Sequence, residues 1–240
     1  MTRIHQSFDR WCAQAPDRVF LHLADGTMTF GQLGRLVATL EAELRADGVR
    51  PGDRALIVAE NCPEHVALIL ACSRVGAWSC GVNARMSPGE VAGFAARADH
   101  RVAYFTSSAS SAAAAHAQRH EATPSALPGL LRSVVRADAV PEPAPLGEQV
   151  AAVIFTSGTT GAPKGVLMTH EGVLHFGRVS AESRVLDADD RSYAYLPMTH
   201  IFGLATVLMA SLQVGASLVM RSQFDPADVL HALATQGVSQ

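Results

Sequence analysis

Apolar positions in the first quarter of the chain recur at the three- and four-residue intervals of an amphipathic helix. Thr29 and Gln32 stand in front of this repeat with the spacing of a capping box, and Asp47-Gly48 ends it. The repeat predicts a helix that packs one face against a core. The residues of that face are Leu33, Leu36, Val37, Leu40 and Leu44.

Further along, short apolar runs alternate with helix-start signals. Asn61-Cys62-Pro63-Glu64 and Ser87-Pro88-Gly89-Glu90 each place a proline in the first turn of a helix, and the first of these helices is expected to end near Gly76. Strand, helix, strand at this spacing predicts parallel pairing with right-handed crossovers, and therefore an α/β fold. The expected strands cover residues 54–59, 78–83, 101–105, 150–156, 166–168, 192–196 and 216–220, with helices up to about residue 182 and over 201–213.

Three stretches give weaker signals. Residues 106–128 are rich in alanine, which favours helix, and in serine, which opposes it, so we make no assignment there. Residues 137–147 carry three prolines and predict an extended surface connection. Asp225-Pro226 begins a last helix that reaches Gly237, and Val238–Gln240 has the β-branched start expected of a further strand.

Composition narrows the class of protein. The chain has 240 residues, 48% of them hydrophobic, which suffices for one large α/β domain or two smaller lobes. A net charge of -3 offers no basic face for nucleic acid. The four cysteines form no CxxC pair and have no histidine at metal-ligand spacing, which favours a reduced, cytoplasmic setting.

Membrane insertion and secretion are not favoured. Residues 1–10 contain charges but no apolar core, so no signal peptide is expected. Residues 196–220 lack Asp, Glu, Lys and Arg, which raises the possibility of a membrane span. This stretch contains Pro197, His200, Gln213 and two glycines, and we interpret it as a strand end, a buried helix and another strand.

The strongest chemical signal is a glycine- and hydroxyl-rich loop, Ser157–Gly165, between two expected strands. Glycines let backbone N–H groups converge on an anion, hydroxyls donate to phosphate oxygens, and Lys164 adds a mobile positive charge. Pro163 fixes one φ just before the lysine. The sequence therefore predicts a phosphate-binding loop. Its candidate residues are Thr156, Ser157, Gly158, Thr159, Thr160, Gly161, Lys164 and Gly165.

Two alternatives to this interpretation are weaker. A Walker A loop requires the order GxxxxGK[ST] and opens a helix, whereas Lys164 follows a proline, precedes a glycine and lies between strands. A plain hairpin turn usually has about two to five residues and needs no lysine.

The string Phe155–Val166 resembles the signature of the adenylate-forming superfamily, which includes acyl- and aryl-CoA synthetases, peptide-synthetase adenylation domains and luciferases. Weaker similarities lie at residues 28–33, 48–54 and 83–85. The resemblance implies the N-terminal part of the large domain of that superfamily, with parallel-rich sheets flanked by helices in two lobes. We expect a first lobe over residues 1–190 and an incomplete second lobe over 191–240.

Residues 196–204 are similar to the family segment beside the acyl or aryl pocket, which implies a pocket role for His200, Ile201, Phe202 and Gly203. Taken alone, His200 is better explained as a core histidine at a helix start, and it is the neighbouring loop that favours the pocket role. Adenylation domains for amino acids place an aspartate in this segment, but residues 196–220 contain no acidic residue. A buried ammonium would then lack a partner, so a fatty or aromatic acid is favoured.

The resemblance implies an acid–thiol ligase. A carboxylate attacks the α-phosphorus of Mg²⁺-ATP, pyrophosphate leaves, and the sulfur of CoA then displaces AMP. ATP and Mg²⁺ are the implied cofactors, CoA the co-substrate and a small carboxylic acid the partner. The family segments for adenine, ribose and the catalytic lysine do not occur in these residues, so we expect the 240 residues alone to be inactive.

Two other hypotheses remain. The chain could be a naturally truncated, non-catalytic module that binds a nucleotide or a partner. It could also be an unrelated nucleotide-binding protein with a chance loop match. The sequence does not indicate an oligomeric state.

Overall fold

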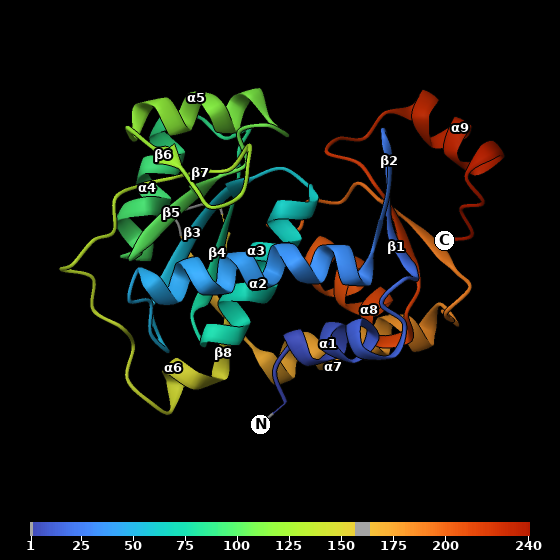
Figure 1. Cartoon of the computed structure of the whole chain (residues 1–240), viewed down its shortest axis with the longest axis horizontal. Coiled ribbons are helices and arrows are strands. Elements are labelled where there is room, and N and C mark those ends of the chain that lie inside the picture. The colour runs from blue at the N-terminus through green and yellow to red at the C-terminus, as the bar shows by residue number, and fades with distance from the viewer. Residues whose placement is uncertain (1, 157–163) are drawn as a thin grey trace.

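The computed structural model describes residues 2–156 and 164–240. Two sheets and the helices that flank them form the fold (Figure 1). The strands are β1 (Val19–Leu23), β2 (Gly26–Thr29), β3 (Arg54–Ala59), β4 (Trp78–Asn83), β5 (Val102–Phe105), β6 (Thr123–Pro124), β7 (Leu131–Arg132), β8 (Val150–Thr156), β9 (Lys164–Thr169), β10 (Arg191–Ala194) and β11 (Ser217–Met220).

The helices alternate with these strands. They are α1 (His5–Gln14), α2 (Phe30–Ala46), α3 (Pro63–Val75), α4 (Pro88–Ala98), α5 (Ser111–Arg119), α6 (Leu146–Gln149), α7 (His170–Ser183), α8 (Ala210–Val214) and α9 (Pro226–Thr235). A π-helical segment, η1 (Phe202–Met209), continues directly into α8.

The larger sheet has the strand order β6-β7-β5-β3-β4-β8-β9. Its four central strands, β5, β3, β4 and β8, are mutually parallel, whereas β9 returns antiparallel to β8. The predicted α/β class and the parallel pairing of the strand–helix–strand units are therefore confirmed.

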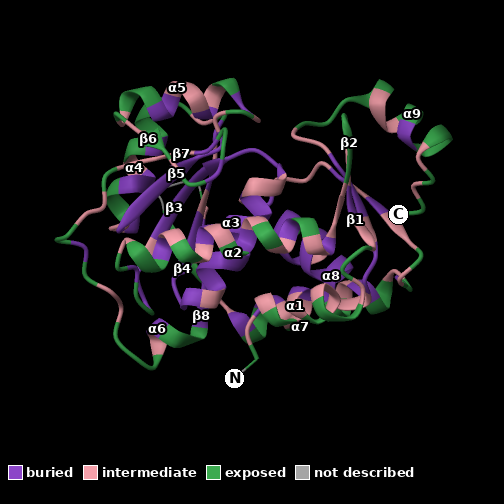
Figure 2. Ribbon diagram, viewed as in Figure 1, coloured by how far each residue is buried: buried purple, intermediate pink, exposed green. Residues whose placement is uncertain are grey.

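Alternation along the strands divides the core into two layers. Ile57 and Ile154 face a cluster that contains α2 and α3, whereas Leu56 and Val153 face a cluster that contains α4. Each central strand is thus buried on both faces, as the continuous apolar runs of the sequence require. The central strands and α3 form the most completely buried part of the molecule (Figure 2).

Local signals set the helix ends as expected. Gln32 donates its backbone N–H to Thr29 Oγ1 at 3.1 Å, and Thr29 donates its own to Gln32 Oε1 at 2.7 Å. The Ser87–Glu90 start also forms a complete capping box. Gly76 ends α3 with a φ of 81°, a conformation that favours glycine.

The smaller sheet has the order β10-β11-β1-β2, so it combines strands from both ends of the sequence. Leu21 and His22 of β1 pair in parallel with Leu218 and Val219 of β11. The division into lobes at residue 190 stays a prediction, and the first hairpin of the chain lies in the same sheet as the strands that follow residue 190.

At the other side of this sheet, the last residues of the chain lie beside β10. Ser239 donates its N–H to Arg191 O at 2.9 Å, and Tyr193 donates to Gln240 O at 3.0 Å. These hydrogen bonds follow the pattern of a parallel pair.

Candidate functional site

The expected phosphate-binding loop connects β8 to β9, which form an antiparallel hairpin. The pairing runs from Val150–Thr169 at the base to Thr156–Lys164 at the far end, where Thr156 Oγ1 donates to Lys164 O at 3.4 Å. Since β8 is parallel to β4, the hairpin delivers the loop to the edge where the parallel strands end at their carboxyl termini. In open α/β sheets this edge is the usual place for ligands.

Several candidate loop residues lie outside the described part of the chain. They are Ser157, Gly158, Thr159, Thr160 and Gly161. Of the remaining candidates, Thr156, Lys164 and Gly165 are exposed.

Lys164 borders a cavity of about 590 Å³ between the hairpin and the end of α4. Arg97 and Asp99 line the same cavity, and the ring of Phe155 closes one side. Gly165 packs closely on β8, because a Cβ there would lie 2.9 Å from Val153 Cγ1. Lys164 is therefore an exposed residue at the start of an edge strand, on the border of an open cavity.

His200 lies in the connection between β10 and η1. Its backbone N–H donates to Pro197 O at 3.0 Å, and its own carbonyl accepts from Leu204 N at 3.0 Å, so the turn leads directly into the helix. The imidazole lies parallel to the ring of Phe202, with centroids 5.7 Å apart and planes 9° apart. Phe202 donates its backbone N–H to His200 Nδ1 at 3.3 Å, which leaves Nε2 of His200 to face outward as a donor.

The other candidates in this segment have different environments. Ile201 packs partly buried against the main core, Phe202 is 54% exposed, and Gly203 is buried. A Cβ on Gly203 would lie 2.2 Å from Pro197 O, so this glycine permits a close approach of two backbone segments. Of the four residues predicted for an acid pocket, His200 is the one that borders the cavity described next.

A cavity of about 230 Å³ separates the His200 segment from the ends of β4 and β8. Its walls are largely apolar, and Phe94 and Phe155 contribute rings whose centroids are 4.8 Å apart. Gly81 and Met86 complete the β4 side. No sequence pattern indicates Phe94 or Met86, because they reach the cavity from α4 and the loop before it only through the tertiary fold.

Phe155 lines both cavities; Lys164 borders the larger one and His200 the smaller one. Arg85, to which the sequence assigns no role, follows β4 closely. Its Nε is 3.1 Å from Oε1 of the buried Glu60, and its backbone N–H donates to Asn83 Oδ1 at 3.0 Å. The charge of Arg85 is therefore paired within the protein.

Three buried ionisable groups are held neutral by burial. Burial raises the pKa of the Cys62 and Cys80 thiols and lowers the pKa of His65 to about 4. None of these three groups is charged near neutral pH, and none of them lines the cavity beside His200.

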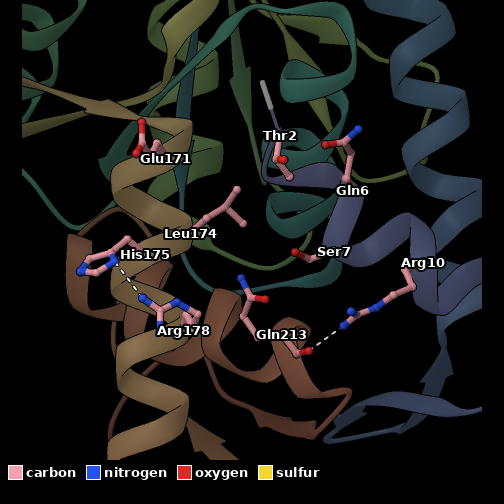
Figure 3. Close-up of a pocket in the computed structure, with 9 residues that line it drawn as sticks. All are labelled: Thr2, Gln6, Ser7, Arg10, Glu171, Leu174, His175, Arg178 and Gln213. Atoms are coloured by element: carbon pink, nitrogen blue, oxygen red, sulfur yellow. Dashed lines mark hydrogen bonds between the residues drawn. The ribbon is translucent and has the colours of Figure 1, made fainter.

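A larger cavity lies elsewhere, between α1 and α7, with a volume of about 690 Å³ (Figure 3). Arg10, His175 and Arg178 line it, and Arg178 donates to His175 Nδ1 at 3.2 Å. Since α7 begins next to the base of the β8–β9 hairpin, this cavity is remote from the far end that carries the loop. Size alone therefore does not identify the site.

Within residues 2–156 and 164–240, no three His, Cys, Asp or Glu side chains gather in a way that could hold a metal ion. None of the helices in these same ranges combines the length and apolar character needed to cross a bilayer.

The α/β fold and the β8–β9 hairpin at the carboxyl edge of its sheet agree with an α/β domain that binds a ligand at this edge. The model of the family described as AMP-binding enzyme matches residues 8–239. The chain belongs to this family of adenylate-forming enzymes, and the predicted family resemblance is confirmed.

Two curated relatives are CoA ligases. The chain is 33% identical to the feruloyl-CoA synthase of an Amycolatopsis species over an alignment of 220 residues. The alignment covers 88% of this chain and 42% of the relative. It is 30% identical to the long-chain-fatty-acid–CoA ligase FadD13 of Mycobacterium tuberculosis over an alignment of 225 residues. This alignment covers 89% of the chain and 44% of the relative. The chain thus spans less than half the length of these two relatives and corresponds to their N-terminal portion.

A solved structure supports the fold independently. The N-terminal domain of FACL13 from Mycobacterium tuberculosis superposes with a TM-score of 0.79 at 24% identity, over 99% of this chain and 62% of that domain. The predicted fold class, the N-terminal part of the large adenylate-forming domain, is confirmed.

Proposed function

We propose that this chain provides the phosphate-binding loop and one wall of the acid pocket of an ATP-dependent carboxylate–CoA ligase. The observation that carries the proposal is the β8–β9 hairpin. It delivers a loop sequence of hydroxyls, glycines and Lys164 to the carboxyl edge of the sheet, beside the apolar cavity bordered by His200.

Lys164 is suited to the charge that develops on leaving pyrophosphate. It is the single lysine of the chain, it is exposed, and it stands at the start of β9 next to the loop. A charge-assisted hydrogen bond from its ammonium to a phosphate oxygen is worth about 1.5–3 kcal/mol. The hydroxyls of Thr156, Ser157, Thr159 and Thr160 are the further donors of this proposal.

The acid is a fatty or aromatic one. Residues 196–220 contain no acidic side chain to pair with the ammonium of an amino acid, and the cavity beside His200 is bordered by Phe94, Phe155 and Met86. The names of the two relatives given above, a feruloyl-CoA synthase and a long-chain-fatty-acid–CoA ligase, support both an aromatic and an aliphatic acid. In this proposal Nε2 of His200, the ring nitrogen that does not accept from Phe202 N–H, donates to a carboxylate oxygen of the acid.

In this proposal a carboxylate oxygen bonds to the α-phosphorus of ATP while the bond to pyrophosphate breaks. The thiolate of CoA then bonds to the carbonyl carbon, and AMP leaves with the electron pair. The chain's own contribution is to hold the two reactants in register and to neutralise the leaving group.

Mg²⁺ accompanies the nucleotide in this proposal. It is usually held by phosphates and one or two carboxylates, not by a preformed protein cage. Such binding is compatible with the described residues, among which no three potential metal ligands gather. All four cysteines are free thiols, which supports a reducing, cytoplasmic location. We further propose that the 240 residues alone form an adenylate only slowly, because the relatives are about twice as long.

The single lysine offers a direct test. Reductive methylation with carbon-13 formaldehyde labels Lys164 and the terminal amine, so the side chain can be followed by NMR without interference from other lysines. We expect Mg²⁺-ATP and pyrophosphate to shift the Lys164 signal in a saturable way. AMP, which lacks the β- and γ-phosphates, serves as the matched control and is expected to shift it little.

The enzyme that contains this chain is then assayed by acid-dependent exchange of pyrophosphate. Lys164→Ala is expected to lower the exchange rate about 10- to 150-fold, the equivalent of one charge-assisted hydrogen bond. The melting temperature is expected to stay unchanged because the side chain is exposed. Unaltered exchange in Lys164→Ala, together with a Lys164 signal that ignores ATP, would refute the proposal.

A further inference from the structure

Asn61 follows β3 directly and is 5% exposed. Its side-chain amide contacts the backbone of the segment that leads to His200. Nδ2 donates to Leu196 O at 2.9 Å and to Ala194 O at 3.4 Å, while Oδ1 accepts from Met198 N at 2.9 Å. One side chain from the larger sheet thus satisfies three backbone groups of a segment that emerges from the smaller sheet.

This role needs an amide. A primary amide is the small side chain that offers two N–H donors and a carbonyl acceptor together. Two of the three groups it contacts are carbonyls and one is an N–H. Since buried backbone groups without a partner are costly, a replacement that lacks either function releases part of the segment.

Close packing holds the same segment on two further sides. A Cβ on Gly81 of β4 would lie 3.1 Å from Thr199 Cα. A Cβ on Gly203 would lie 2.2 Å from Pro197 O. At both glycines the segment 197–203 is so close that it has no room to shift further inward. The Asn61 hydrogen bonds and this packing together define one position for the segment.

We propose that Asn61 is a positioning residue of the acid pocket, holding residues 194–198 so that His200 forms the wall of the cavity opposite Phe155. Asn61 itself does not border that cavity. The inference rests on the proposed function for the nature of the ligand, but the anchoring of the segment is independent of it.

Amide hydrogen exchange tests the anchoring in the 240-residue chain. Asn61→Ala is expected to raise the exchange rate of the Met198 amide about tenfold or more, because its acceptor is removed. Amides of β4 are expected to exchange as in the wild type. Ser110→Ala is the matched control, since it removes a buried hydroxyl that accepts from Ala113 N at 3.1 Å in α5, away from the site.

Binding measurements test the positioning. Ferulate and palmitate are titrated by calorimetry, and Mg²⁺-ATP is followed through the labelled Lys164. Asn61→Ala is expected to weaken binding of the acid about tenfold and to leave ATP binding unchanged. A general loss of structure would weaken both.

Asn61→Asp separates the two halves of the contact. It retains the acceptor for Met198 N and loses the donors to Ala194 and Leu196, so the Met198 amide is expected to stay protected while acid affinity falls. If Asn61→Ala does not fold, Asn61→Asp decides the positioning, because an acid affinity equal to that of the wild type in this variant would overturn the inference.

Two results would overturn the inference. The first is an exchange rate of the Met198 amide that is equal in the wild type and Asn61→Ala. An increase of this rate in Ser110→Ala as large as that in Asn61→Ala would count in the same way. The second is an acid affinity that falls only in parallel with ATP affinity. If the wild type binds neither acid, the proposed pocket fails, and the exchange comparison still decides whether Asn61 anchors the segment.

Discussion

Replacing His65 is expected to remove a specific part of the pH dependence of stability. This histidine lies in α3, is fully buried, and neither ring nitrogen has a hydrogen-bond partner in the described part of the chain. It borders a cavity of about 10 Å³ together with Met198 and Leu204, where α3 meets the segment after β10. Burial lowers its pKa from 6.5 to about 4.

The sign follows from the depressed pKa. In the folded chain His65 stays neutral down to about pH 4, whereas the unfolded chain binds a proton below about pH 6.5. The unfolded state is therefore favoured as the pH falls through this window, and the stability contributed by the neutral histidine is fully present above about pH 6.5. At about 1.4 kcal/mol per pKa unit, the loss between about pH 7.5 and pH 5 is about 2 kcal/mol.

Urea unfolding followed by circular dichroism at these two pH values measures the effect. On acidification the free energy of unfolding of His65→Leu is expected to fall by about 2 kcal/mol less than that of the wild type. The buried His170, whose pKa burial also lowers to about 4, is present in both proteins and cancels in the comparison. His231→Gln, on the exposed face of α9, controls for the removal of a histidine as such. Equal pH dependence in wild type and His65→Leu would refute the reasoning.

Further substitutions test an ion pair and the packing of two glycines. Asp53→Ala leaves the buried Arg101, now 2.8 Å from Asp53 Oδ2, without its carboxylate, and unfolding in urea should show a loss of about 3–5 kcal/mol. The double replacement of Asp53 by Leu and Arg101 by Met should cost much less, and an equal cost would contradict this. Gly203→Ala forces a Cβ against Pro197 O and should cost about 1–3 kcal/mol and weaken acid binding. Gly89→Ala, with nothing within 4 Å, should instead stabilise α4 by about 0.5–1 kcal/mol, and the reverse order of the two glycine variants would contradict the packing argument.

The parts of the fold with strong local signals were predictable from the sequence. The strands at 54–59 and 78–83 have the predicted bounds, and the helix expected after Asn61 runs from Pro63 to Val75. Their residues are apolar on both faces and their ends carry proline or glycine, so local preference and tertiary burial agree. The sequence does not predict α5, because alanine favours a helix and serine opposes it. The helix forms because Ala113 and Ala117 become buried against the sheet.

Other features depend on partners distant in sequence. β1 pairs with β11, which lies almost two hundred residues later, and no local pattern contains that information. The helix expected over residues 201–213 begins as the π-helical η1, in which Thr206 Oγ1 donates to Phe202 O at 2.6 Å. Apolar periodicity gives the length of such a helix but not its hydrogen-bond pattern.

The candidate site was predictable to the same limited extent. Residue types identify the loop around Lys164 because phosphate binding needs glycines, hydroxyls and a cation in one short stretch. They identify His200 only through resemblance to a family segment. Phe94 and Asn61 act through the tertiary fold, and a phenylalanine in a helix or an asparagine after a strand has many other uses.

The position of the site at the joint between the two sheets has a physical consequence. The wall formed by His200 belongs to a segment that leaves the smaller sheet, whereas Phe155 belongs to the larger one. The shape of the cavity therefore depends on contacts across the joint. One is the hydrogen bond from Asn61 to Leu196 O. Another is the packing of the buried Met198 and Leu204 beside His65. Because interiors are close-packed, changes in these contacts alter the cavity without touching its lining, so selectivity for the acid should be adjustable from residues that the ligand never meets.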